Sequence, residues 1–141
     1  MLLLSCSDEE QVVPVQPPPV DRIVIDGNSL AVGGYNHIFS DSGYHVVNVA
    51  VGGQSITRMI QDCIDVDSSI TDGSLLIVDE VTNELFFGAS ADSALERLRR
   101  YCDERRRLHP SIRIAVVTPT PRSNPGTHED FESKRMLAIA M

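Results

Sequence analysis

The stretch Arg22-Ile-Val-Ile-Asp-Gly-Asn-Ser-Leu-Ala-Val-Gly33 decides the fold of this 141-residue chain. Its apolar, β-branched beginning predicts a buried strand over residues 20–26. A Gly-Asn-Ser turn ends that strand, and the amphipathic segment that follows predicts a helix over residues 30–39. Because glycine permits a tight turn, we expect Ser29 at the tip of the strand, where a nucleophilic side chain can be presented.

Strand-like and helix-like patterns alternate along the rest of the chain. Further strands are predicted over residues 45–51, 74–79 and 112–118, and further helices over residues 55–63, 89–108 and 129–141. The strands are continuous apolar runs, which is typical of strands buried on both faces of a parallel sheet. The pattern therefore predicts an α/β fold, a three-layer sandwich with helices on both sides of one sheet. Ser90 is predicted to cap the long helix, which ends at His109-Pro110.

Two later strands also end in small or amide-bearing residues. Asn48 and the pair Gly52-Gly53 close the second strand, and Thr82-Asn83-Glu84 follows the third. Ligands of parallel sheets gather outside the carboxyl ends of the strands, so we expect the three turns to lie together. Each turn alone has an ordinary structural explanation, such as helix capping by Asn28 or Ser29. Their occurrence at consecutive strand ends favours a functional site.

The net charge of −8 argues against a nucleic-acid partner or an anionic membrane surface, because a polyanion would be repelled. The arginines between residues 97 and 107 are expected on the polar side of the long helix, whose apolar side carries Leu98 and Cys102. A solvated helix face is therefore favoured over a nucleic-acid patch. The cysteines lack zinc-ligand spacing, and Cys63 and Cys102 are predicted to be small thiols on apolar helix faces.

The first 19 residues form a segment distinct from the predicted domain of residues 20–141. Leu3-Leu4-Ser5-Cys6 and the proline-rich stretch after it resemble the end of a bacterial lipoprotein signal and its tether, in which the cysteine is lipidated. The apolar segment before Cys6 is shorter than in such signals and has no basic start. Either the true start lies upstream, or the match is accidental. The first alternative implies attachment to the cell envelope through Cys6, and secretion is the other location considered.

The three turns together resemble the motifs of the SGNH, or GDSL-type, hydrolase superfamily of serine esterases and acyl hydrolases. The resemblance covers about residues 20 to 125 and implies a parallel, flavodoxin-like sheet. It implies that Ser29 is the nucleophile and that the Gly53 N–H, the Asn83 side-chain amide and the Ser29 N–H donate hydrogen bonds to the oxyanion. The implied substrate is an ester of a small molecule or a glycan that carries an O-acetyl or another acyl group. Neither a cofactor nor a metal is expected.

Four departures from the family pattern stand out. Asn28 replaces the usual aspartate, Asp26 lies where an apolar or small residue is common, and Val81 replaces a glycine. The Asp-x-x-His block that supplies the general base is absent from this chain. Of the histidines, His109 is expected at the opposite edge of the sheet, and only His128 follows the fourth strand.

The final segment, residues 129–141, has an apolar stripe but no capping glycine and no following strand. We therefore expect that the last strand, the last helix and the general base follow in a longer protein. Two other hypotheses stay open. One is an inactive SGNH-like module that binds a ligand or a carbohydrate. The other is a nucleotide-binding domain, which is disfavoured because residues 27–34 lack the GxGxxG spacing and the P-loop lysine. The sequence indicates no oligomeric state.

Overall fold

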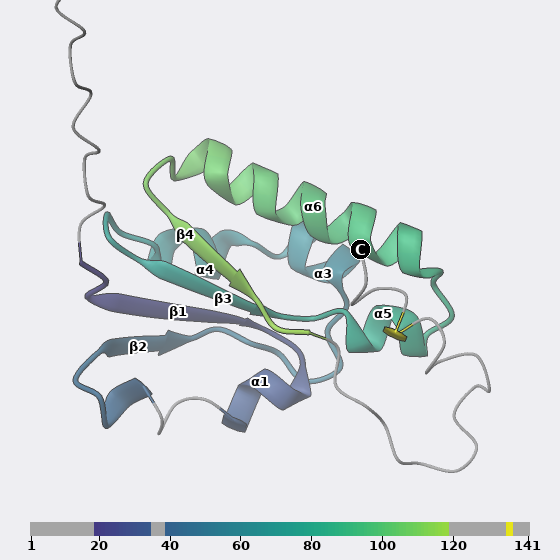
Figure 1. Ribbon diagram of the computed structural model, residues 1–141, viewed down its shortest axis with the longest axis horizontal. Helices are drawn as coiled ribbons and strands as arrows, with labels where there is room; N and C mark the ends of the chain where they lie inside the picture. The colour runs from purple at the N-terminus through teal and green to yellow at the C-terminus, as the bar shows by residue number, and fades with distance from the viewer. Residues whose placement is uncertain (1–18, 35–38, 119–134, 137–141) are drawn as a thin grey trace, which may run out of the picture.

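Four parallel strands form one sheet in the computed structural model, which describes residues 19–34, 39–118 and 135–136 (Figure 1). The strands are β1 (Arg22–Gly27), β2 (His45–Asn48), β3 (Leu75–Asp79) and β4 (Arg113–Val116). Their order in the sheet is β2-β1-β3-β4, and every pair is parallel. This is the flavodoxin-like order, so the predicted α/β class and sheet type are confirmed.

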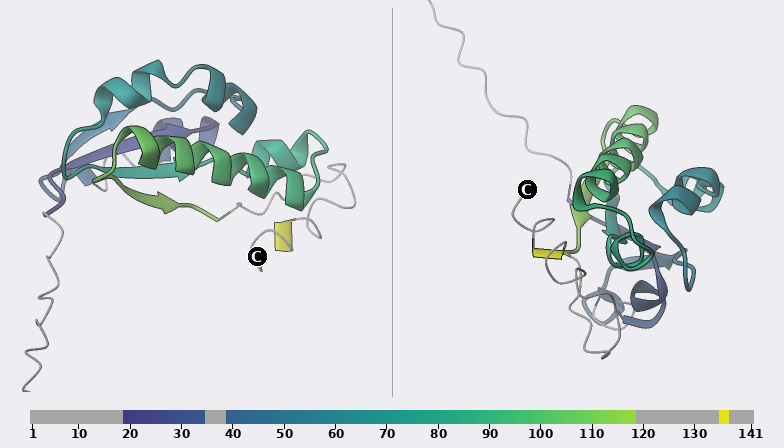
Figure 2. Two further views of the ribbon diagram at one scale, coloured as in Figure 1. Left: turned by 90° about the horizontal axis from the view of Figure 1, so that it is seen from above. Right: turned by 90° about the vertical axis from the view of Figure 1, so that its right-hand side faces the viewer.

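Helices lie on both faces of this sheet (Figure 2). They are α1 (Ser29–Gly34), α3 (Ile56–Gln61), α4 (Ile64–Ser69), α5 (Thr82–Phe86) and α6 (Ala91–Leu108). The helices α3, α4 and α6 cover one face, and α1 lies against the other (Figure 2). The predicted three-layer arrangement is thus confirmed.

Alternate residues of the central strands fill two separate parts of the core. Val24, Leu76 and Val78 point toward α3, α4 and α6, where they pack with Ile56 and Tyr101. Their neighbours Ile23, Ile25 and Ile77 point to the other face, where they pack with Ala31 of α1. Because both faces are covered, the central strands have apolar side chains at successive positions, such as Ile23 to Ile25, rather than at alternate ones.

The predicted helices differ from the observed ones mainly in length. The segment predicted as one helix over residues 55–63 ends at Gln61, and α4 follows it as a separate helix. Ser90 caps α6 as predicted, because its Oγ accepts a hydrogen bond of 3.2 Å from the Ser93 N–H. Of the helix predicted over residues 30–39, α1 forms the part up to Gly34, and residues 35–38 lie outside the described residues. Almost all of the segment predicted as a helix over residues 129–141 also lies outside them.

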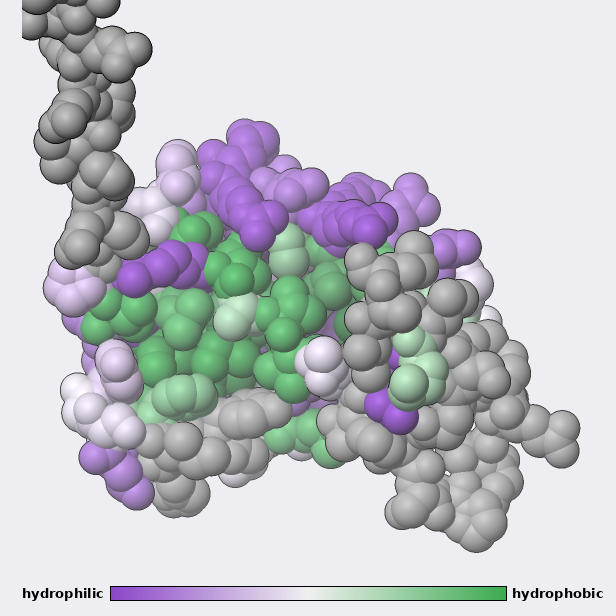
Figure 3. Space-filling view, viewed as in Figure 1, coloured by the Kyte–Doolittle hydropathy of each residue, from purple (hydrophilic) through white to green (hydrophobic). Residues whose placement is uncertain are grey.

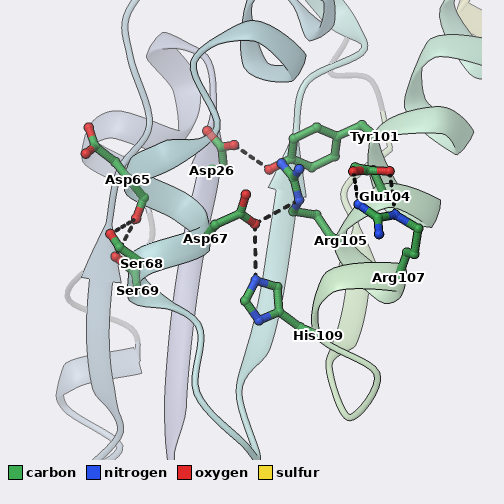
Figure 4. A network of polar contacts seen from close by, with 10 residues as sticks. All are labelled: Asp26, Asp65, Asp67, Ser68, Ser69, Tyr101, Glu104, Arg105, Arg107 and His109. Atoms are coloured by element: carbon green, nitrogen blue, oxygen red, sulfur yellow. Dashed lines mark hydrogen bonds and ion pairs between the residues drawn. The ribbon is translucent and has the colours of Figure 1, made fainter.

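The polar face of α6 contains most of its arginines, as predicted, and hydrophilic side chains follow this helix along the edge of the molecule (Figure 3). Arg105 is the exception, since it is only 2% exposed. Its Nε lies 3.0 Å from Asp67 of α4, and its guanidinium lies 5.1 Å from the centre of the Tyr101 ring (Figure 4).

Both cysteines in the described ranges are free thiols, Cys102 buried and Cys63 half-buried. Among the described helices, none is long and apolar enough to span a membrane.

Candidate active site

The carboxyl ends of β1 and β3 lie side by side, because these strands pair in register from Ile23 with Leu75 to Gly27 with Asp79. The chain passes from β1 to β2 on one side and then crosses to β3 on the other, so the strand order reverses between β1 and β3. Open α/β sheets bind their ligands at such a switch point. The predicted turns follow β1, β2 and β3, and the fold therefore brings them to one edge.

Ser29 is the first residue of α1 and is exposed. The glycine pair after β2 lies next to it, since a β-carbon on Gly52 would be 3.9 Å from the Ser29 Cβ. The following residue, Gly53, is exposed and has a φ of 73°, a backbone conformation that favours glycine. The predicted nucleophile and the predicted glycine turn are thus neighbours in space.

The Gly-Asn-Ser turn is fastened to the end of β3. Gly27 has no room for a side chain, because a β-carbon there would clash with the Asp79 carbonyl oxygen. The Asn28 N–H donates to that oxygen at 3.2 Å, and the Asn28 Oδ1 accepts from the Leu30 N–H at 2.8 Å. The Asn28 Nδ2 also donates to a carboxylate oxygen of Glu80. Asn28 therefore caps the first turn of α1, which is the helix-capping role considered for it from the sequence. It also fixes the turn to the neighbouring strand.

Gln54 connects all three turns through hydrogen bonds. Its side chain is buried, and its Nε2 donates to Asp26 Oδ1 at 3.1 Å and lies 3.5 Å from the Gly27 carbonyl oxygen. Its own carbonyl oxygen accepts a hydrogen bond of 2.9 Å from the Asn83 Nδ2. The sequence does not mark Gln54 as a site residue, because a glutamine after two glycines is ordinarily expected at the surface.

Asn83 lies in the first turn of α5, and only 3% of it is exposed. Its hydrogen bond to Gln54 fixes the orientation of the side-chain amide. Val81, which replaces the family glycine, has a φ of −135° and therefore needs no glycine. The Val81 side chain packs into the core between the sheet and α6, so this departure has a structural explanation.

Several carboxyl groups at the turns are buried, and the pKa of two of them, Asp26 and Glu80, is raised. Asp26 accepts a hydrogen bond of 2.5 Å from the Tyr101 hydroxyl (Figure 4) and one of 3.1 Å from Gln54. Burial raises the pKa of Asp26, while these hydrogen bonds act in the opposite direction. Burial also raises the pKa of Glu80 to about 7, although the hydrogen bond from Asn28 lowers it. Glu80 was not predicted as a site residue, because no sequence signal marks a glutamate for complete burial.

Two histidines fall within the described residues, and both lie at the amino edge of the sheet. His109 ends α6 just before β4, and its Nε2 is 3.2 Å from Asp67 Oδ1 (Figure 4). This confirms the place that the sequence predicted for His109. His45 begins β2 and is exposed. His37 and His128 lie outside the described residues. Within the described ranges, no His, Cys, Asp or Glu cluster could hold a metal ion.

Comparison with known proteins finds the fold in solved structures. No family model matches the chain, and no curated relative matches it. A member of the lipolytic protein G-D-S-L family from Veillonella parvula DSM 2008 matches with a TM-score of 0.63 and 15% identity. The D162A mutant of esterase AlinE4 matches with a TM-score of 0.62 and 21% identity. A family 3 carbohydrate esterase from Clostridium thermocellum matches with a TM-score of 0.61 and 11% identity.

The chain has the SGNH-hydrolase fold. The three matches cover 84%, 85% and 86% of this chain and 70%, 69% and 70% of the respective solved chains. At these identities the likeness concerns the fold. In this SGNH fold, Ser29, Gly53 and Asn83 follow three strands that end at the same edge, which is the arrangement expected from the sequence.

Proposed function

We propose that the chain is a serine hydrolase that cleaves an ester through an acyl-enzyme on Ser29. One observation carries the proposal. An exposed serine lies at the switch point of an SGNH-fold sheet, with the Gly52-Gly53 turn beside it and Asn83 held toward the same edge by Gln54. The solved structures with this fold include proteins described as esterases, which supports ester hydrolysis as the reaction class.

The proposed reaction has two steps. The Ser29 Oγ attacks the ester carbonyl while its proton passes to a base, and the C–O bond to the alcohol then breaks as the base gives that proton to the leaving alkoxide, which leaves an acyl-serine. Water then gives a proton to the base and attacks the acyl-serine, and the bond to Ser29 breaks as the base returns the proton to its Oγ, which releases the acid. Negative charge develops on the carbonyl oxygen in both steps, and each preorganised donor there is worth roughly 3–4 kcal/mol. The proposed donors are the N–H groups of Ser29 and Gly53 and the side-chain amide of Asn83.

The base that takes the Ser29 proton is tested separately. His45 and His109 lie at the far edge of the sheet, so they are poor candidates. His128 follows β4 in sequence and is the histidine of this chain to test first. We expect His128→Ala to abolish ester hydrolysis if His128 is the base. Unchanged hydrolysis in that variant assigns the proton to another group.

Labelling with a fluorophosphonate probe tests the nucleophile. We expect covalent labelling of the wild-type chain and none of Ser29→Ala, with Ser68→Ala as a matched control on an exposed face of α4. Asn83→Ala is expected to lower kcat for 4-nitrophenyl acetate by about 100-fold or more, the usual effect of removing an oxyanion donor. Equal labelling of wild type and Ser29→Ala would refute the proposal.

A second candidate is a module of the same fold that binds an ester or a carbohydrate without cleaving it. It is favoured by the position of the described histidines, neither of which is near Ser29. This candidate predicts no probe labelling and no hydrolysis, together with a ligand-dependent rise in the melting temperature.

A further inference from the structure

A buried carboxylate connects the turn that contains Ser29 with the helix that contains Asn83. Glu80 follows the last residue of β3 and is 0% exposed. One oxygen of its carboxylate, Oε2, accepts a hydrogen bond from the Asn28 Nδ2. The other oxygen, Oε1, accepts a hydrogen bond of 3.1 Å from the Glu84 N–H. The two oxygens of one side chain therefore bond to two different segments of the proposed site.

Both hydrogen bonds end next to a group that the proposed reaction uses. Asn28 precedes Ser29 in the chain, and its Oδ1 caps the first turn of α1. A movement of the Asn28 side chain would therefore move the turn that presents the serine. Glu84 follows Asn83 in the first turn of α5. Each contact of Glu80 is thus one residue away from the proposed nucleophile or from a proposed oxyanion donor.

The hydrogen-bonding groups of Asn28 and Glu80 are complementary. The Asn28 amide has an acceptor, which caps α1, and a donor, which bonds to Glu80. An ionised carboxylate only accepts, and Glu80 uses one oxygen for each of its two neighbours. Asn28→Asp would therefore place a second carboxylate against Glu80. Glu80→Gln would leave one acceptor oxygen where two are used.

We propose that Glu80 is a positioning residue, which sets the distance between Ser29 and Asn83 by bonding to the segment next to each of them. This role rests on the proposed ester hydrolysis. In that reaction the Ser29 Oγ and the Asn83 amide must meet the same carbonyl group, one at its carbon and the other at its oxygen. A misplacement of about 1 Å around a reacting centre can lower the rate by roughly 100-fold. Glu80 itself takes no proton in either step and acts through Asn28 and the first turn of α5.

An exchange of the two side chains tests this role, with the rate constant of fluorophosphonate labelling at Ser29 as the measurement. The full chain is labelled at pH 8, because burial raises the pKa of Glu80 to about 7 and the carboxylate is then mostly ionised. Asn28→Asp and Glu80→Gln should each lower the rate constant by about tenfold or more, since each breaks one of the two connections.

The double variant Asn28→Asp/Glu80→Gln should recover most of the lost rate. Its glutamine amide can donate to the introduced aspartate and still accept from the Glu84 N–H, while that aspartate keeps an acceptor for the cap of α1. We expect a rate constant within about threefold of the wild type, because both connections are restored. Glu96→Gln, at an exposed position on α6, is the matched control and should not change the rate.

Urea unfolding of the same proteins separates positioning from stability, and the rate constants are compared for the folded fraction. If Asn28→Asp does not fold at pH 8, the comparison of Glu80→Gln with the double variant decides. A lower free energy of unfolding with unchanged labelling would overturn the inference, and so would a double variant as slow as Glu80→Gln. Either result leaves the proposed reaction intact, since the wild type is labelled. No labelling of the wild type would instead refute the proposed reaction, and the role of Glu80 with it.

Discussion

At the scale of single residues, Gln54 is the group on which the geometry of the site depends. Its side chain holds Asp26 below the first turn, and its carbonyl oxygen holds Asn83 of the third turn. A displacement of Gln54 would therefore change the position of a proposed oxyanion donor relative to Ser29. Small misplacements of groups around a reacting centre are costly, so Gln54 is expected to act as a positioning residue.

We predict that Gln54→Met lowers both stability and reactivity. Without the Nε2 donor, Asp26 loses a buried hydrogen-bond partner, and the free energy of unfolding should fall by about 1–3 kcal/mol. Urea denaturation measures this change, and the rate of fluorophosphonate labelling at Ser29 should fall at least tenfold. Gln61→Met, at an exposed position on α3, is the matched control and should change neither quantity. A loss of stability with an unchanged labelling rate would restrict Gln54 to a structural role.

Glu80 is predicted to make stability depend on pH. Burial raises its pKa from 4.5 to about 7, so the folded protein binds a proton that the unfolded chain releases between these values. Stability conferred by Glu80 therefore decreases as pH rises from 4.5 to about 7, by roughly 3 kcal/mol at 1.36 kcal/mol for each pKa unit. Urea unfolding at pH 4.5 to 8 should show this decrease in wild type relative to Glu80→Gln. Parallel pH profiles for the two proteins would contradict it.

At the scale of secondary-structure elements, the pattern of apolar residues predicts the four strands. It does not predict the short helices, which lack a clear apolar pattern. The sequence predicts all four strands because each contains at least two consecutive apolar residues, mostly β-branched or leucine. The short helices α4 and α5 were missed, since α4 has one buried residue, Val66, among acidic and serine residues. In α5 the buried set includes Asn83 and Glu84, whose burial depends on partners that are distant in sequence, namely Gln54, Thr57 and Arg97.

The N-cap of α6 provides a prediction at this scale. Ser90→Ala removes the oxygen that accepts from the Ser93 N–H and should lower the free energy of unfolding by about 1 kcal/mol. Ser90→Asp keeps an acceptor and a favourable charge at the helix N-terminus, so its stability should be close to that of the wild type. Thermal or urea unfolding of the three proteins distinguishes these cases. If Ser90→Asp loses as much stability as Ser90→Ala, the cap contributes little.

At the scale of the whole molecule, polar contacts connect the helices to the sheet and to one another in addition to hydrophobic packing. The Tyr101 hydroxyl of α6 bonds to Asp26 of β1, and Arg105 of α6 pairs with Asp67 of α4 (Figure 4). The helix α6 therefore connects the sheet beneath Ser29 with the neighbouring helix. No sequence pattern predicts these contacts. Tyr101 and Asp26 are 75 positions apart in the sequence and Arg105 and Asp67 are 38 apart, so the members of each pair meet only when the fold is complete.

A double-mutant cycle on Tyr101→Phe and Asp26→Asn tests the link between α6 and the sheet. Hydrogen bonds to charged groups contribute about 1.5–3 kcal/mol, and contacting residues in one network are not additive, so a coupling energy of that size is expected at pH 8. Because burial raises the pKa of Asp26, the carboxyl becomes protonated more readily than an exposed aspartate as pH falls, and the coupling should decrease with it. Tyr44→Phe, at an exposed tyrosine, is the control for loss of a hydroxyl. Strict additivity of the two substitutions at pH 8 would show that α6 is held to the sheet by apolar packing alone.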